Sequence, residues 1–227
     1  MTTSTTRNTH IYFVLDRSGS MQTIVSDVIG GFNSYIAQQA LEGSDALITF
    51  IQFDSQDSHH VVFSALPVTE VRELTSSSFV PRGATPLYDA MGHAIASATI
   101  RAEQVKNQTT GEDIVFVTFT DGEENDSIEY DRKKIFTLIK KREKLGWTFV
   151  YLGANQDAYG EADLAGFDKA NVSNFVADAA GTQTAFDSLS KATSMRRARQ
   201  RSGQKFSSMD FFEGDKAADL DAEQRAK

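Results

Sequence analysis

Four short, continuous apolar runs constrain the fold of this chain more than any other feature of its sequence. Each run is five to eight residues long and is rich in β-branched or aromatic side chains. Apolar residues that are continuous rather than alternating indicate strands buried on both faces, which is typical of a parallel sheet. The runs are residues 11–15, 46–53, 113–120 and 147–152.

Between these runs, apolar residues recur every three or four positions, which is the spacing of one face of an α-helix. Alternating strands and helices predict a doubly wound α/β fold with helices on both faces of a mostly parallel sheet. A weaker apolar run at residues 60–63 follows the second strand after a short polar turn, so we expect one antiparallel edge strand there. The helical positions are Ile24, Val28, Phe32, Tyr35 and Ile36, then Leu87, Met91, Ile95 and Ala98, then Ile135, Leu138, Ile139 and Leu145.

The pattern continues less regularly towards the C-terminus. We expect an N-terminal tail at residues 1–8, one domain at 9–200 and a C-terminal tail at 201–227, since the length suits one globular domain. We predict that the C-terminal tail is mobile and lies outside the core. Its apolar cluster leaves open that it folds back onto the domain or serves as a recognition segment. That cluster is Phe206, Met209, Phe211 and Phe212. The later elements expected within the domain are a helix near 157–165, a strand near 172–176 and a helix from about 179 to 199.

The composition excludes several classes of protein. The 227-residue chain has no cysteine, which excludes disulfides, thiolate metal sites and a cysteine nucleophile. Its apolar runs are far shorter than the roughly 18 residues that a membrane helix needs. Residues 1–9 lack the apolar stretch of a secretory signal. We therefore expect a cytoplasmic protein with no membrane partner.

The charge is uneven along the chain. There are 31 acidic and 23 basic side chains, for a net charge of −8, yet residues 191–205 hold six basic residues and no acid. We expect no nucleic-acid partner, because phosphate binding needs a basic face and this segment is the only feature in its favour. The segment is most simply the end of the last helix, where cations interact favourably with the helix dipole. Docking to an acidic partner or to nucleic acid is the alternative.

Five oxygen-bearing side chains follow strand ends or precede a helix. Ligands of an open parallel sheet bind at the carboxyl ends of its strands, so we expect three loops to meet at this edge. Two carboxylates and three hydroxyls suit Mg²⁺, or else Mn²⁺ or Ca²⁺, rather than Zn²⁺ or Cu²⁺. The predicted metal ligands are Asp16, Ser18, Ser20, Thr85 and Asp121.

Such a site leaves the metal an open coordination position. Hydroxyls are neutral ligands, and Mg²⁺ keeps several of its waters, so few protein groups would hold the metal directly. If either carboxylate acts only through water, the cation stays strongly electrophilic. This is the physical condition for binding a carboxylate from another molecule.

These residues resemble the metal-ion-dependent adhesion site of the von Willebrand factor type A domain family. The family pattern Asp-x-Ser-x-Ser matches Asp16, Ser18 and Ser20. Its distant threonine matches Thr85 in Gly-Ala-Thr-Pro-Leu, and its last aspartate matches Asp121 in Thr-Asp-Gly-Glu. The surrounding sequence looks most like stand-alone bacterial or phage members of the family.

The resemblance covers roughly residues 9–199, which is most of the chain. It implies a Rossmann-like fold in which three hydroxyls ligate the metal directly and two aspartates act through water. A glutamate or aspartate of a partner protein would complete the coordination. The direct ligands would be Ser18, Ser20 and Thr85, and the water-mediated ones Asp16 and Asp121.

Each part of the motif also has a simpler explanation. Thr85 before Pro86 is typical of a helix N-cap and its first turn. Ser18 and Ser20 are residues that often cap helices or form turns, and Asp121 before a glycine is typical of a plain turn. The joint occurrence of all five residues in family order favours the metal site. Competing motifs fail: the sequence has no nucleophile elbow, calcium loop, Gly-x-Gly-x-x-Gly or Walker lysine.

We expect a non-enzymatic, metal-dependent protein-binding module that captures a partner carboxylate. The alternative is a phosphoesterase-like hydrolase that uses the same metal to activate water, although the motifs include no obvious general base. His59 and His60 are interpreted either as a second metal or pH-sensitive patch or as solvated loop residues. The acids after Asp121 either raise cation affinity and select the partner or form a solvated loop. These acids are Glu123, Glu124 and Asp126.

Overall fold

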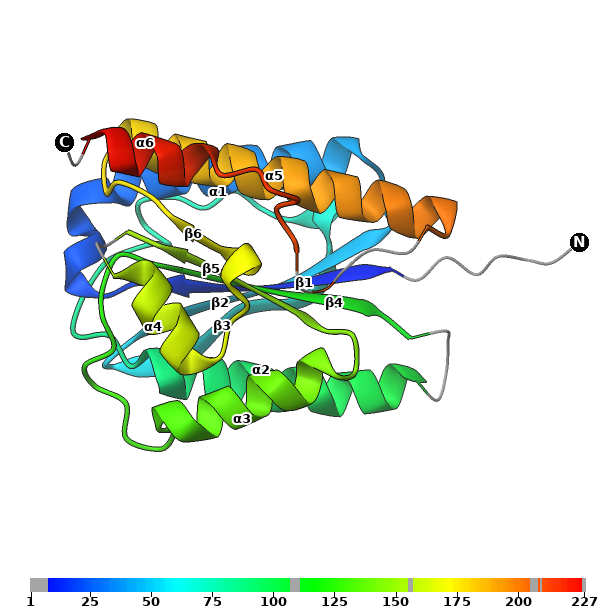
Figure 1. The fold of residues 1–227 in the computed structure, drawn as a ribbon, viewed down its shortest axis with the longest axis horizontal. Coiled ribbons are helices and arrows are strands. Elements are labelled where there is room, and N and C mark those ends of the chain that lie inside the picture. Colours follow the sequence, from blue (N-terminus) through cyan, green and yellow to red (C-terminus); the bar gives the residue numbers. More distant parts are fainter. Residues whose placement is uncertain (1–7, 107–110, 155–156, 205–207, 209, 226–227) are drawn as a thin grey trace, which may run out of the picture.

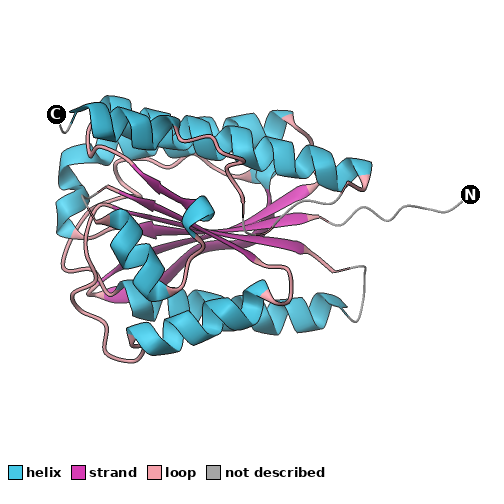
Figure 2. Cartoon of the chain, in the orientation of Figure 1, coloured by secondary structure: helices cyan, strands magenta, loops and turns pink. Residues whose placement is uncertain are grey.

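The computed structural model is an open sheet of six strands with helices on both faces (Figures 1 and 2). The strand order is β3-β2-β1-β4-β5-β6, with β3 antiparallel to β2 and all other neighbours parallel. The predicted doubly wound α/β fold with one antiparallel edge strand is confirmed. The strands are β1 (Thr9–Asp16), β2 (Ala46–Asp54), β3 (Asp57–Pro67), β4 (Asp113–Thr120), β5 (Thr148–Gly153) and β6 (Val172–Asn174). The structure describes residues 8–106, 111–154, 157–204, 208 and 210–225.

The helices form one layer on each face of the sheet. α1, α5 and α6 cover one face, and α2, α3 and α4 cover the other (Figure 1). A 3₁₀ turn at Gly19–Ile24 leads into α1. In the part of the chain that the structure describes, no helix is both long and apolar enough to cross a membrane. The helices are α1 (Val25–Leu41), α2 (Leu87–Lys106), α3 (Arg132–Glu143), α4 (Ala158–Ala165), α5 (Ala179–Ser202) and α6 (Ala217–Arg225).

Two apolar cores hold these layers together. Beneath α1 and α5, the ring of Phe13 lies 5.2 Å from that of Phe32 and 6.2 Å from that of Phe186. On the other face, the rings of Tyr12 and Phe116 stack 4.7 Å apart. Tyr12 and Phe13 serve opposite cores because successive strand side chains point to opposite faces. Every residue of β1 and β4 is buried, as continuous apolar runs lead one to expect.

The chain after α5 packs back onto the domain, in a stretch that we call the return segment (residues 210–225). Phe211 and Phe212 are buried in the core beneath α1 and α5, and α6 lies along α5 (Figure 1). The side chain of Asn171 donates to the carbonyl of Ser208 and accepts from the N–H of Phe211. The expectation of a tail outside the core is therefore wrong for this segment, because burial removes its aromatic rings from water. Two further residues of the predicted apolar cluster lie outside the described residues: Phe206 and Met209.

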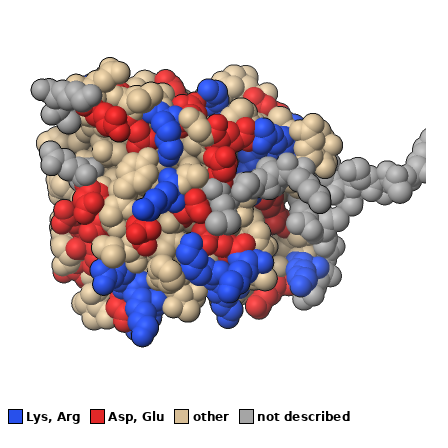
Figure 3. All heavy atoms as spheres, in the orientation of Figure 1, with Lys and Arg blue, Asp and Glu red and all other residues tan. Residues whose placement is uncertain are grey.

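The basic side chains near the end of α5 are paired within the chain. Arg196 makes two hydrogen bonds of 2.7 and 2.6 Å to Asp113 at the start of β4. Arg197 is fully buried and binds Asp45 at 2.6 Å. On the face drawn in Figure 3, basic and acidic side chains are interspersed. The remaining pairs are Lys191 with Asp215, Arg199 with Glu213 and Arg201 with Glu42. These ion pairs therefore hold α5 and the return segment in place.

Phe212→Ala is expected to destabilise the protein by about 3–5 kcal/mol, because it removes a fully buried ring from the core. The matched control is Leu220→Ala on α6, whose side chain is 55% exposed and whose loss should change stability by no more than about 0.5 kcal/mol. Denaturant unfolding measures both values. Equal, small effects would mean that the return segment is not part of the folded core.

Candidate metal centre

The parallel pairing of β1 with β4 brings the two predicted aspartates together. Leu15 of β1 pairs with Phe119 of β4, so both strands reach the same edge of the sheet within a residue of each other. Asp16 is the last residue of β1, and Asp121 directly follows the last residue of β4. The register of the sheet therefore sets the separation of the two carboxylates.

Hydrogen bonds connect four of the five predicted ligands. The Ser20 hydroxyl donates to Asp121 Oδ1 at 2.6 Å and lies 3.0 Å from the Ser18 hydroxyl. One carboxylate oxygen of Asp16 accepts from the N–H of Ser18 at 2.6 Å. The other accepts from the hydroxyl of Thr120, also at 2.6 Å. The structure thus places these side chains in one group, as the sequence predicted.

Thr85, the fifth predicted ligand, reaches the same group from the loop before α2. A Cβ atom on Gly122 would lie 3.1 Å from Thr85 Oγ1, 3.4 Å from Ser20 Oγ and 3.8 Å from Asp16 Oδ2. Oxygen atoms from separate loops therefore surround one point, which remains open because residue 122 is glycine. Asp16, Ser18 and Thr85 are buried, whereas Ser20 is exposed. The group is thus accessible to solvent on one side.

The Thr85 hydroxyl does not cap α2, although threonine before proline is typical of an N-cap. Within the described residues this hydroxyl makes no hydrogen bond, while the N–H of Thr85 donates to Asn125 Oδ1 at 2.8 Å. Two N–H groups in the first turn of α2 also donate to side chains of the loop after β4. Tyr88 donates to Glu124 at 2.9 Å and Asp89 donates to Ser127 at 3.1 Å. The Thr85 hydroxyl is therefore left for another ligand.

Glu124 binds its own chain, which differs from both interpretations offered for the acids after Asp121. Its carboxylate accepts from the hydroxyl and the N–H of Ser127, each at 2.8 Å, as well as from α2. Asp89, in the first turn of α2, accepts hydrogen bonds from three backbone N–H groups of the loop after β4. The donors are Ile128, Glu129 and Tyr130. These two carboxylates fix the loop after β4 against the start of α2, and Glu123 and Asp126 remain exposed.

A second network fixes the loop before Thr85 against the loop after β1. Arg17 and Arg82 both donate to the same oxygen of buried Asp54, at 2.7 and 3.0 Å. The backbone N–H of Arg82 donates to the carbonyl of Arg17, and that of Gly19 donates to the carbonyl of Gly83. This network therefore fixes the Ser18 and Thr85 hydroxyls relative to each other.

Sequence reasoning missed several supporting residues. Thr120 stands directly before Asp121, so its position at the strand end was a signal that it faces the site. Gly122 was considered only as part of a turn. No local pattern marks Asp54 or Glu124 as a link between loops, because the partners that they hold in other loops lie far away in the sequence: Arg17 and Arg82 for Asp54, and Tyr88 for Glu124.

Burial raises the pKa of both aspartates. The pKa of Asp16 rises to about 7, because loss of solvation outweighs the hydrogen bonds from Thr120 and Ser18, and the charge of Asp121 adds to the rise. Burial also raises the pKa of Asp121, against the hydrogen bond from Ser20. A cation placed between the two carboxylates would stabilise their charged forms. The unbonded Thr85 hydroxyl, the open point beside Gly122 and an all-oxygen donor set fit a divalent cation.

His59 and His60 do not complete a second metal site. His60 Nδ1 lies 3.4 Å from Asp57 Oδ2, and the ring of His59 lies 5.7 Å from that of His93. Across the described ranges, no group of three or more His, Asp and Glu side chains is placed to hold a metal. The centre described above contributes only two carboxylates, and its other donors are hydroxyls.

Solved structures with the same arrangement of strands and helices include the pilus adhesin SpaC of Lactobacillus rhamnosus GG. It matches with a TM-score of 0.62 and 13% identity over 85% of this chain and 31% of its own. A von Willebrand factor type A protein from Catenulispora acidiphila matches with a TM-score of 0.55 and 13% identity, over 83% of this chain and 43% of its own. The sequence matches no protein-family model and no curated protein.

Another similar structure is the proximal thread matrix protein 1 of the mussel byssus, with a zinc-occupied MIDAS motif. Its TM-score is 0.58 and its identity 14%, over 83% of this chain and 46% of its own. This chain spans less than half of the length of each of the three proteins. The chain therefore has the fold of the von Willebrand factor type A domain.

Proposed function

We propose that this protein is a non-enzymatic module that binds a partner protein through a divalent metal. The observation that carries the proposal is the convergence of Asp16, Ser20 and Thr85 around the open point beside Gly122. Ser18 and Asp121 join the group through hydrogen bonds to Ser20. The group is open to solvent, as a site that receives a group from another molecule has to be.

The metal we propose is Mg²⁺, because all five side chains offer hard oxygen atoms. Ser18, Ser20 and Thr85 would hold it directly, and Asp16 and Asp121 through water. The zinc-occupied motif of the mussel protein supports a divalent metal on this fold. When bound, the metal supplies a Lewis-acidic position for one further oxygen ligand.

The proposed partner is a protein that presents a glutamate or aspartate side chain. Neutral hydroxyl ligands leave much of the cation's charge uncompensated, so a carboxylate is the favoured additional ligand. The networks around Asp54 and Glu124 hold the loops in place before the partner arrives, which lowers the entropic cost of binding. Action in the cytoplasm, without a membrane or nucleic-acid partner, is part of this proposal. Nothing in the described residues favours the alternative of a metal-dependent hydrolase.

Gly122→Ala is expected to weaken Mg²⁺ and Mn²⁺ binding by about 10- to 100-fold, because the added methyl group would occupy the space between Thr85 and Ser20. Calorimetric titration with each metal measures this change. Gly30→Ala on α1 is the matched control, since its Cβ would meet nothing within 4 Å. Unchanged metal affinity in Gly122→Ala would contradict the assignment of the centre.

The stabilising effect of Mg²⁺ is expected to grow with pH. The folded-state pKa of Asp16, about 7, lies above its ordinary value of 3.8. In the metal-free protein, the contribution of Asp16 to stability is therefore fully present below its ordinary pKa and is lost as the pH rises through its folded-state pKa. Mg²⁺ binds the ionised form of Asp16. Melting temperatures with and without Mg²⁺ at about pH 6 and about pH 8 test this. In Asp16→Asn, the pH dependence and the Mg²⁺ effect should both become smaller, with Asp121 left as their other source; values equal to those of the unchanged protein would exclude Asp16 as a source.

Capture of a partner from a lysate of the source cells should require Mg²⁺ and the intact centre. We expect it to be lost with a chelator and in the double variant Asp16→Ala, Thr85→Ala, and to persist in Thr137→Ala, an exposed threonine on α3. Changing single acids of the captured protein to amides should identify the carboxylate that reaches the metal. Capture that survives both the chelator and the double variant would disprove the proposed function.

A further inference from the structure

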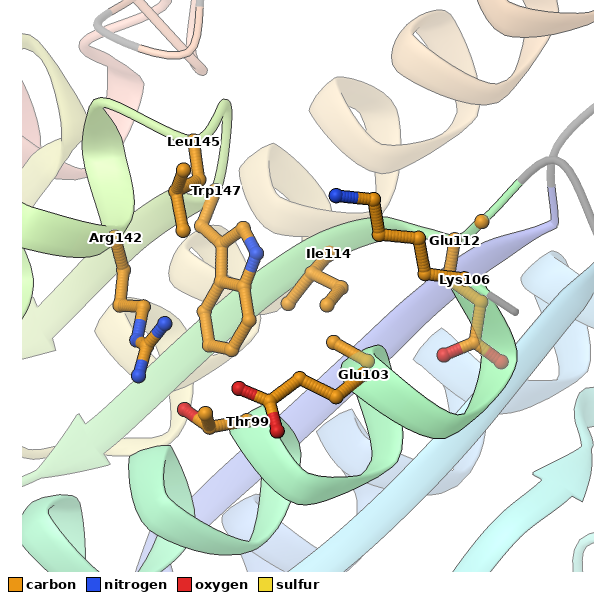
Figure 4. A pocket seen from close by; sticks show the side chains of 10 residues that line it. Thr99, Glu103, Lys106, Glu112, Ile114, Arg142, Leu145 and Trp147 are labelled. Carbon is orange, nitrogen blue, oxygen red and sulfur yellow. The ribbon is translucent and has the colours of Figure 1, made fainter.

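A pocket lies at the amino end of the sheet, opposite the metal centre. Its volume is about 390 Å³, within the range of sites for small molecules. It is formed by the last turns of α2, the start of β4 and the connection between α3 and β5 (Figure 4). Trp147, the only tryptophan of the chain, forms one wall.

The walls carry hydrogen-bond donors that have no acceptor. The guanidinium of Arg142 lies 5.3 Å from the centre of the Trp147 ring, and its Nε is buried without a hydrogen-bond partner. In the described residues, the indole N–H also donates to nothing and Lys106 has no acidic partner. A buried donor left unpaired destabilises the folded protein, because it has lost its hydrogen bonds to water. A ligand that supplies acceptor oxygens would remove this cost.

The charges of the lining favour an anion. Glu112 is already neutralised by Arg101 at 2.6 Å and also binds His10 at 2.8 Å. This leaves the cations Arg142 and Lys106 against the single acid Glu103, a surplus of one positive charge. In Figure 4, Lys106 extends from α2 towards one side of the indole and Arg142 from α3 lies on the other.

The remaining lining is apolar. Ile114 and Ala102 line the pocket, and Leu145 stands beside it with its side chain 64% exposed. The indole stacks on Phe116, with ring centres 5.8 Å apart, so the ring is held in place. A ligand would therefore meet an apolar surface next to unpaired cationic donors.

We propose that this pocket binds a small organic carboxylate with an apolar body. The carboxylate is received by the guanidinium of Arg142, which suits it as a forked donor, and the field of Lys106 adds to the attraction. The apolar body lies against Ile114 and Leu145. This site is separate from the metal centre and does not depend on the proposed function.

Three probes with the same apolar body and different head groups test the proposal: hexanoate, hexanol and hexylamine. Fluorescence of Trp147 reports on the pocket directly because no other tryptophan contributes, and calorimetry gives the affinity. Hexanoate is expected to bind saturably, at least about tenfold more tightly than the other two, since a charged hydrogen bond contributes about 1.5–3 kcal/mol. Binding should be the same in the presence of a chelator.

Two substitutions should change hexanoate affinity in opposite directions. Arg142→Gln is expected to weaken it about tenfold or more, and Glu103→Gln to strengthen it, because it removes the opposing charge. Arg72→Gln, on the opposite side of the domain, is the matched control and should bind like the unchanged protein. The proposal is overturned if hexanoate shows no saturable binding, if the three probes bind alike, if hexylamine binds best, or if Arg142→Gln binds as tightly as the unchanged protein.

Discussion

The hydrogen bond from Thr120 to Asp16 depends on the parallel register of β1 and β4, and the whole candidate centre depends on that register. A shift of one residue would turn Asp16 to the other face of the sheet and exchange the side chains that β1 presents to the two cores. The apolar packing that stabilises the sheet is therefore also what fixes the carboxylates. Because burial of Asp16 raises its pKa, the same packing disfavours two negative charges at the centre unless a cation compensates them.

The acids at this edge of the sheet divide into two groups according to what they bind. Asp54, Asp89 and Glu124 accept hydrogen bonds from arginine side chains or from backbone N–H groups, and they join the three loops. Asp16 and Asp121 accept only from hydroxyls and nearby N–H groups at the open point. The first group provides rigidity and the second remains free for a cation. A net charge of −8 alone does not separate these roles.

The fold and the five grouped side chains could be predicted because their signals are local. Continuous apolar runs mark buried strands, and parallel strands place whatever follows them at one edge. For the return segment, the apolar cluster indicates either packing onto the domain or a recognition segment, and the sequence does not decide between them because Phe212 is buried by contacts with residues distant in the chain. The same holds for Arg196, whose partner Asp113 begins another strand. The local sequence of Thr85 fits both an N-cap and a metal ligand. Contacts from the loop after β4 argue against the N-cap, because they take up the N–H groups of Thr85 and Tyr88.

The direction of β1 has a practical consequence for how the protein can be presented to other molecules. The strand begins at Thr9 and ends at Asp16, so the chain enters the sheet about 25 Å from the candidate centre. A surface or fusion protein joined ahead of Thr9 would leave the edge with the candidate centre facing away from the attachment point. The return segment ends on the opposite side, near the carboxyl ends of the strands (Figure 1). There, Arg225 at the end of α6 pairs with Asp178 at the start of α5. Immobilisation ahead of Thr9 would therefore leave the edge with the candidate centre accessible, whereas immobilisation after Arg225 would crowd it.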